Sequence, residues 1–282
     1  MHDNPKSERE LIQIVNGVAA SDGAGVQLTR IIGSPELDML DPFLMLDAFG
    51  SDKPDDYIAG FPSHPHRGFE TVTYIIAGRM RHKDSTGREG IIGPGGVQWM
   101  TAGKGIIHSE MPEQEEGLLM GFQLWVNLPA SAKMTEPVYQ EYPEEEIALS
   151  RLEDGTEIRV ICGKTNTGVR GTVSNEYVNP TFMDVTLPKG QSFQQDLAED
   201  DNAFIYVLDG ELGIGQKNLQ CKKLGVLGNG KNVMVSAEGA DARFILVAGR
   251  PLNEAVARSG PFVMNTREEV MQAFQDYQQN RF

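Results

Sequence analysis

Glycine recurs every few residues through the middle of the first half of this chain, and this spacing limits the fold more than any other feature. Between short apolar runs, glycine occupies positions 87, 90, 93, 95, 96, 103 and 105. Glycine adopts the positive φ of tight turns without steric cost, and such turns join short antiparallel strands. The pattern therefore favours an all-β fold of the barrel or sandwich type over a helical one.

The second half of the chain repeats this arrangement. Short apolar runs with glycine turns return after a polar, proline-bearing stretch between Pro129 and Glu146, which ends in three consecutive glutamates. With 282 residues, the chain is also longer than most single domains. We expect two barrels, residues 1–140 and 145–282, with a short helix at the end of the second.

Three local signals refine this expectation. The Asn16-Gly17 and Asp22-Gly23 pairs favour two early hairpins. Thr266 and Glu269 form a capping-box pair, and Val270, Phe274 and Tyr277 follow at helical spacing, which predicts the terminal helix. Residues 121–127 read as a strand that places Gln123 and Trp125 on one face.

Two short runs in the first half repeat one spacing. His64 is followed two residues later by His66, and His108 is followed two residues later by Glu110. On a β-strand, side chains two residues apart lie on the same face. If both runs are strands and lie side by side, three imidazoles and one carboxylate converge.

Such a donor set suits a divalent transition metal: Fe, Mn, Co, Ni, Cu or Zn. In an octahedral site, four protein ligands leave two positions open for water, dioxygen or a chelating substrate. All five histidines lie in the first 108 residues, so the second barrel lacks imidazoles for an equivalent site.

The acidic ligand is not settled by this reasoning. Glu70 lies four residues after His66 and, on a regular strand, would share its face. It competes with Glu110 for the ion, unless Gly68 interrupts the alternation or Glu70 pairs with Arg67.

Two further ionisable residues have alternative interpretations. Asp47 lies in an apolar run and is either a turn or capping carboxylate at a strand end or a pocket group near the metal. His82, inside the run Arg81-His82-Lys83-Asp84, is interpreted as a solvated turn residue.

Composition excludes several classes of partner. With 25 Lys+Arg against 40 Asp+Glu, the formal charge is -15, and no basic run is present, so direct nucleic-acid binding is not expected. The opening MHDNPKSERELI lacks the pattern of a signal peptide, and no stretch approaches the roughly 18 apolar residues of a membrane span, so we expect a cytoplasmic protein without membrane contact. Cys162 and Cys221 show no Cys-x-x-Cys spacing and are interpreted as reduced packing residues.

Three stretches of this sequence, HPHRGFETVTYIIAG, QWMTAGKGIIHSEMP and GPFVMNT, resemble the pirin family, the bicupins of the cupin superfamily. The resemblance implies two cupin-type barrels. The first would bind one iron, Fe(II), through His64, His66, His108 and Glu110, and the second would bind no metal.

The resemblance does not settle the function. Some family members are reported as quercetin 2,3-dioxygenases, whereas eukaryotic members act as nuclear cofactors of transcription factors. One hypothesis is an iron-dependent dioxygenase that cleaves a flavonol-type aromatic substrate with O2, in which Glu110 is the catalytic base. The alternative is a non-catalytic, redox-sensing iron protein that regulates a protein partner. In either role we expect a monomer.

Overall fold

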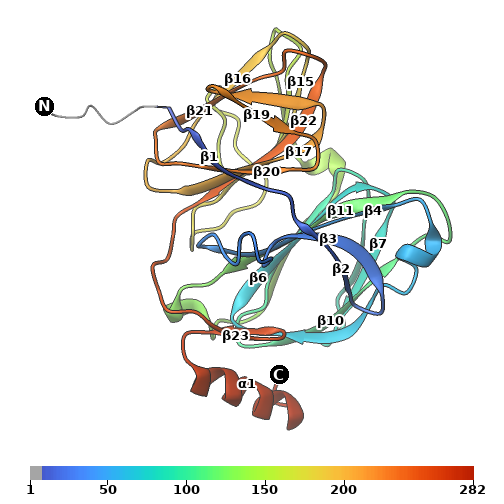
Figure 1. The fold of residues 1–282 in the computed structure, drawn as a ribbon. Helices are drawn as coiled ribbons and strands as arrows, with labels where there is room; N and C mark the ends of the chain where they lie inside the picture. The colour runs from blue at the N-terminus through green and yellow to red at the C-terminus, as the bar shows by residue number, and fades with distance from the viewer. Residues whose placement is uncertain (1–7) are drawn as a thin grey trace, which may run out of the picture. The chain divides into compact units, whose positions relative to one another are not determined.

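Short antiparallel strands make up almost all of the regular secondary structure in a computed structural model that describes residues 8–282 (Figure 1). They form two units. We call residues 18–145 with 252–282 the amino-terminal barrel, and residues 8–17 with 146–251 the carboxy-terminal barrel. The all-β fold expected from the glycine spacing is confirmed. No helix in the described part of the chain is long and apolar enough to span a membrane.

The amino-terminal barrel contains a seven-stranded and a four-stranded sheet. The larger has the order β12-β9-β6-β11-β4-β3-β2, with β2 (Val18–Asp22), β3 (Val26–Ile32), β4 (Phe43–Ser51), β6 (Phe69–Ala77), β9 (Val97–Thr101), β11 (Leu119–Asn127) and β12 (Val138–Tyr142). The smaller has the order β5-β10-β7-β8, with β5 (Phe61–His66), β7 (Met80–Asp84), β8 (Glu89–Ile92) and β10 (Ile106–Pro112). Three short 3-10 helices lie in loops: η1 (Pro54–Asp56), η2 (Ala130–Ala132) and η3 (Glu144–Glu146).

The carboxy-terminal barrel has the same two-sheet plan. Its larger sheet has the order β1-β20-β17-β22-β15-β14-β13, with β1 (Leu11–Val15), β13 (Ala148–Arg151), β14 (Glu157–Cys162), β15 (Thr181–Leu187), β17 (Asn202–Asp209), β20 (Leu224–Leu227) and β22 (Ala242–Gly249). Its smaller sheet has the order β16-β21-β18-β19, with β16 (Ser192–Asp196), β18 (Glu211–Ile214), β19 (Lys217–Gln220) and β21 (Asn232–Ser236). The repeat expected from the sequence is therefore present strand for strand.

Strand β1 lies far in sequence from the rest of its sheet: it precedes β2 in the chain but pairs with β20 of the carboxy-terminal barrel. Residues 252–282 follow the carboxy-terminal barrel in the chain but belong to the amino-terminal barrel. At both chain ends, this division differs from the boundaries expected from the sequence, 1–140 and 145–282. The reason is that the local sequence of a strand does not determine which sheet edge it pairs with.

Only one of the two early hairpins forms. β2 and β3 pair across the turn that begins at Asp22-Gly23. The prediction of a hairpin at Asn16-Gly17 is wrong. Strand β1 pairs with β20 and not with β2, and it buries Leu11 in the core of the carboxy-terminal barrel. Gly17 does adopt a positive φ of 73°, so the turn signal fixed the local conformation but not the partner strand.

The carboxyl-terminal segment consists of β23 (Ala257–Ser259), β24 (Phe262–Met264) and the helix α1 (Arg267–Gln278). The capping box predicted at Thr266 and Glu269 is confirmed, with both reciprocal hydrogen bonds present. Val270 and Ala273 are buried against Phe262 of β24. Helix and hairpin therefore pack as one element, seen together in Figure 1.

Lys133 fastens this segment to the amino-terminal barrel. Its buried Nζ donates hydrogen bonds to Gly68 O, Asn127 Oδ1 and Val263 O at 2.8, 2.7 and 3.0 Å. Burial lowers the pKa of Lys133 to about 8. Gly68 also allows the close approach, because a Cβ added there would lie 1.9 Å from Val263 O. The hairpin β23–β24 is thus held against the turn that follows His66.

Candidate metal centre

The smaller sheet of the amino-terminal barrel brings the two sequence pairs together. β5 and β10 pair antiparallel, with His108 opposite His64 and Ile106 opposite His66. Along β10, Ile106, His108 and Glu110 are buried while the residues between them are more exposed, as expected for a strand with one face toward the interior. The juxtaposition expected from the two spacings is therefore present.

The three imidazoles form a tight cluster. One ring nitrogen of each of His64, His66 and His108 lies within 4.8 Å of the others. His64 Nε2 and His66 Nε2 are 2.9 Å apart, and the ring centroids are separated by 4.6 to 5.0 Å. Two nitrogens bound to one ion at right angles, each at roughly 2.1 Å, would lie about 3.0 Å apart, so the His64–His66 spacing fits a shared ion.

The hydrogen bonds of these rings also fit a metal. His64 Nδ1 lies 2.8 Å from Pro62 O, to which it donates, so Nε2 carries the free lone pair. Both ring nitrogens of His108 are buried without a hydrogen-bond partner among residues 8–282. A buried polar atom without a partner is costly, and an ion bound by His108 would remove part of that cost.

The electrostatic environment keeps the rings of His66 and His108 neutral, which is the form that binds metals. Burial, followed by the neighbouring His108 and His64, holds the pKa of His66 well below its usual value. Burial lowers the pKa of His108 to about 4, although Glu110 acts in the opposite direction.

Glu110 lies beside the cluster but is not one of its three donors in this structure. Its side chain is buried, Thr73 Oγ1 donates to Oε1 at 2.7 Å, and Gln123 Nε2 donates to Oε2 at 3.1 Å. The pairing of β10 with β5 shifts register between His108 and Glu110, and such irregularities redirect side chains. Its role as the fourth ligand, implied by the resemblance, stays a prediction.

Glu70 belongs to the other sheet. β5 ends at His66, Gly68 has a φ of 87°, and β6 then begins at Phe69, so the strand alternation from His66 does not continue to Glu70. The Glu70 carboxylate accepts a hydrogen bond from Thr101 Oγ1 at 2.7 Å. The pairing considered for Glu70 and Arg67 is replaced by a 2.7 Å ion pair between Arg67 and Asp276.

Asp47 matches neither interpretation made from the sequence. It lies within β4, and both of its carboxylate oxygens accept hydrogen bonds from Arg30, at 2.9 and 2.7 Å. Burial raises the pKa of Asp47, against the opposing effect of Arg30. The Asp47 carboxylate therefore holds the guanidinium of Arg30 in place.

His82 is not a solvated turn residue, and that interpretation was wrong. It lies in β7, is 4% exposed, stacks on Tyr139, and its Nε2 is 2.5 Å from Glu141 Oε2. Burial would raise the pKa of Glu141, but hydrogen bonds with His82 and Gln98 outweigh it and lower the pKa. The alternation of Met80, His82 and Asp84 along the strand was the signal that predicts this burial.

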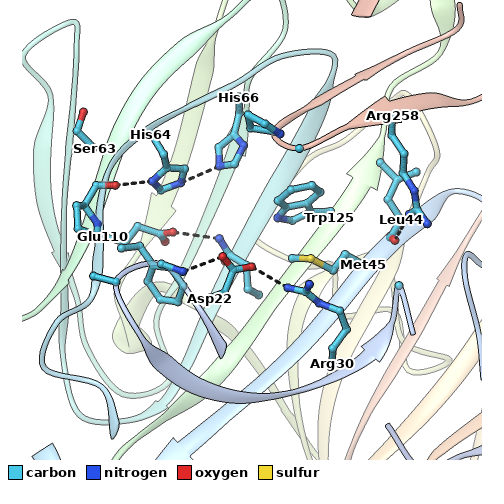
Figure 2. Close-up of a pocket in the computed structure, with 18 of the residues that line it drawn as sticks. Asp22, Arg30, Leu44, Met45, Ser63, His64, His66, Glu110, Trp125 and Arg258 are labelled. Atoms are coloured by element: carbon cyan, nitrogen blue, oxygen red, sulfur yellow. Dashed lines mark hydrogen bonds and ion pairs between the residues drawn. The ribbon is translucent and has the colours of Figure 1, made fainter. Parts of the chain in front are cut away.

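A cavity of about 800 Å³ opens beside the histidines (Figure 2). His64, His66, Glu110 and Gln123 line one part of it, and the aromatic rings of Trp125 and Phe61 line another. The ring centroid of Trp125 lies 5.4 Å from that of His66. Gln123 and Trp125 thus share a face, as the alternation in residues 121–127 predicts.

Two arginines in the cavity wall were missed by sequence reasoning. Arg30 comes from β3 and Arg258 from β23, and both line the cavity. Neither has a local motif; only the docking of residues 252–282 onto this barrel places Arg258 there.

The carboxy-terminal barrel has apolar side chains at the corresponding place. Its strands β16 and β21 pair as β5 and β10 do, but they contribute Phe193, Val233 and Val235 to a large apolar core.

Two β-barrels of one plan, one of them with a buried three-imidazole cluster beside a cavity, define a bicupin with a candidate metal centre. The family model described as Pirin matches residues 25–126, and the model described as the Pirin C-terminal cupin domain matches residues 182–282. The chain therefore belongs to the pirin family, as the three sequence stretches indicated.

Relatives cover nearly the whole chain. A pirin-like protein of Caulobacter vibrioides is 53% identical over 274 residues, which are 97% of this chain and 99% of that protein. A Pseudomonas aeruginosa protein named "putative quercetin 2,3-dioxygenase" is 46% identical over 275 residues, 95% of this chain and 96% of that protein. The crystal structure of a quercetin 2,3-dioxygenase from Acinetobacter baumannii matches with a TM-score of 0.89 and 34% identity, covering 98% of each chain.

Proposed function

We propose that this protein is an iron-dependent dioxygenase that cleaves a flavonol-type substrate, such as quercetin, with O2. The observation that carries the proposal is the three-imidazole cluster on the wall of a cavity of about 800 Å³. That volume is in the range of sites for drug-sized ligands. The names of the Pseudomonas and Acinetobacter relatives support the same reaction class.

The residues that would hold the ion are His64, His66 and His108, with Glu110 as the acidic ligand. When bound, Fe(II) would supply Lewis acidity and open positions for a chelating substrate and for dioxygen. His66 and His108 are suited to this because burial lowers their pKa and so keeps them in the neutral form that coordinates a metal.

Glu110 is also the residue best placed to accept a proton from the substrate 3-hydroxyl. Its carboxylate is buried beside the histidines, and Thr73 and Gln123 fix its orientation through one hydrogen bond each. A base held in this way loses little orientational freedom when the substrate arrives.

The apolar part of the cavity fits a flat aromatic substrate. Trp125 packs against Phe69 with ring centroids 4.3 Å apart, so the indole is held rigidly at the cavity wall. Stacking on such a ring would orient the substrate and keep bulk water away from the reacting oxygens.

Oxygen uptake tests the proposal. The protein is reconstituted anaerobically with Fe(II), and oxygen consumption and the loss of flavonol absorbance are followed after addition of quercetin. We expect turnover by the native protein and a loss of at least a hundredfold in His108→Ala, because that substitution removes one ligand nitrogen. Glu70→Gln is the matched control, since Glu70 lies in the other sheet.

If the iron-loaded native protein consumes oxygen with quercetin no faster than His108→Ala does, the dioxygenase assignment is contradicted. The regulatory alternative would then be favoured, and it predicts that pull-downs with ferrous and with ferric protein recover different partners.

A further inference from the structure

The cavity has a second polar end, formed by Arg30 and Arg258. Figure 2 shows both guanidinium groups on the side of the cavity away from His64, with Trp125 drawn between Arg258 and the histidines. Arg30 is paired with Asp22, which also lines the cavity, and with Asp47, so a ligand that reaches from the histidines along Trp125 would meet the positive charge of Arg258.

The two arginines differ in how strongly they are neutralised. Arg30 is paired with Asp47, a buried carboxylate, through two hydrogen bonds, so its charge is already compensated inside the protein. Arg258 donates from Nη2 to Asp38, whose side chain is 84% exposed. An ion pair with so exposed a partner is weak and exchangeable.

Arg258 also keeps hydrogen-bonding capacity. Its Nη1 donates to Leu44 O at 3.2 Å and its Nη2 to Asp38, but Nε has no partner among residues 8–282. The Nε and Nη2 protons lie on one edge of the guanidinium, the edge that binds a carboxylate through two parallel hydrogen bonds. An incoming carboxylate would use Nε and take the place of Asp38 at Nη2.

The backbone around Arg258 is built to hold it there. Arg258 is paired with Val263 in the β23–β24 hairpin, Val263 N donates to Arg67 O at 3.0 Å, and Arg67 N donates to Pro261 O at 3.3 Å. Val263 is fully buried. The hairpin is thus joined directly to the residue after His66, so Arg258 and the histidine cluster keep a fixed separation across the cavity.

We infer that Arg258 is a specificity-determining residue that selects aromatic substrates carrying a carboxylate on the ring remote from the metal-chelating oxygens. This inference rests on the proposed function, because it assumes that the chelating end of the ligand lies at His64, His66 and His108. In a protein of net charge -15, an anionic ligand is otherwise repelled, so a local cation is required for its selection.

Binding measurements with two matched ligands test this. Zinc-loaded protein is titrated anaerobically, by calorimetry, with flavonol and with 4′-carboxyflavonol. We expect the native protein to bind the carboxylate about tenfold more tightly than flavonol, as a charge-assisted pair provides. In Arg258→Gln the ratio should fall to about one while flavonol binding stays within about twofold, and Arg258→Lys should retain part of the preference.

Arg267→Gln is the control, since it removes the same charge from an exposed position that does not line this cavity. Its preference should equal that of the native protein. Melting curves and zinc content of every variant check that the fold and the metal centre are intact.

Equal affinities of the native protein for both flavonols, or an unchanged ratio in Arg258→Gln, would overturn the inference and leave the dioxygenase proposal standing. Conversely, absence of oxygen uptake with iron would not alter these affinities, because binding to the zinc form needs no turnover. If neither flavonol binds, both the inference and the flavonol assignment fail.

Discussion

At the scale of single residues, the surroundings of His108 point to the candidate metal centre. A buried imidazole normally donates and accepts hydrogen bonds. Here His108 has a buried ring with neither nitrogen bonded among residues 8–282, and burial lowers its pKa to about 4. His82, only one strand away, contacts Glu141 and stacks on Tyr139. His82 Nε2 therefore has a carboxylate oxygen 2.5 Å away, whereas the rings that lie beside His108 are the imidazoles of His64 and His66.

Glutamate substitutions distinguish the two candidate acidic ligands. Glu110→Gln removes the carboxylate beside the histidines, and we expect the affinity for Fe(II) or Zn(II) to fall at least tenfold, because a neutral amide is a poorer ligand for a cation. Competition with a chromophoric chelator measures the affinity. Glu70→Gln keeps an acceptor for Thr101 and should leave the affinity unchanged. The reverse pattern, with Glu70→Gln weakened and Glu110→Gln unaffected, would show that the acidic ligand was assigned to the wrong residue.

At the scale of elements, the β23–β24 hairpin connects the carboxyl-terminal segment to the candidate metal centre. Arg67, the residue after His66, exchanges backbone hydrogen bonds with Pro261 and Val263 and forms an ion pair with Asp276 of α1. Residues nearly 200 positions away in sequence therefore support the strand that carries His64 and His66. Gly68 is the point of closest approach, where the backbone of the hairpin occupies the space of a side chain.

Two glycine substitutions measure this contact. Gly68 and Gly87 have almost the same φ, 87° and 89°, but a Cβ at Gly87 would have no atom within 4 Å, whereas at Gly68 it would meet Val263 O at 1.9 Å. Gly87→Ala should cost about 1 kcal/mol of unfolding free energy from backbone strain alone. Gly68→Ala should cost at least about 2 kcal/mol more, because the hairpin must shift. Urea denaturation measures the unfolding free energy of both variants. Equal losses of unfolding free energy would mean that the β23–β24 hairpin can move away from position 68 without destabilising the fold.

At the scale of the whole molecule, one plan is used twice with different interiors. Phe193, Val233 and Val235 fill the carboxy-terminal barrel at the strands that correspond to β5 and β10. The amino-terminal barrel has histidines and a cavity there instead. Since β1 completes the sheet of the carboxy-terminal barrel, damage to β1 should affect stability but not the metal centre.

Adjacent residues of β1 test this separation. Leu11 is 2% exposed and belongs to the core of the carboxy-terminal barrel, whereas Ile12 is 60% exposed. Leu11→Ala should lower the unfolding free energy by about 2–4 kcal/mol, while Ile12→Ala should change it by less than about 0.5 kcal/mol. Neither should alter the metal affinity of the folded protein. A weakened metal site in Leu11→Ala at a temperature where it is fully folded would refute the independence of the two barrels.

Much of the site was accessible from the sequence because its signals are local. The two-residue spacing of His64 and His66, and of His108 and Glu110, has one geometric meaning on a strand, and glycine turns made strands the expected element. The interpretation of His82 failed although its signal was also local: the charged neighbours Arg81 and Lys83 suggested solvent, while the alternation with Met80 and Asp84 pointed inward.

The sequence by itself determined the strands, the capped helix and the pairs of candidate metal-binding side chains, since each depends on residues only a few positions apart. Only the tertiary structure decided that Asn16-Gly17 makes no hairpin, that residues 252–282 join the amino-terminal barrel, and that Arg258 faces the cavity of His64 and His66. The physical reason is that a sheet edge or a buried face selects its partner by shape and hydrogen bonding across long chain separations, which no local pattern encodes.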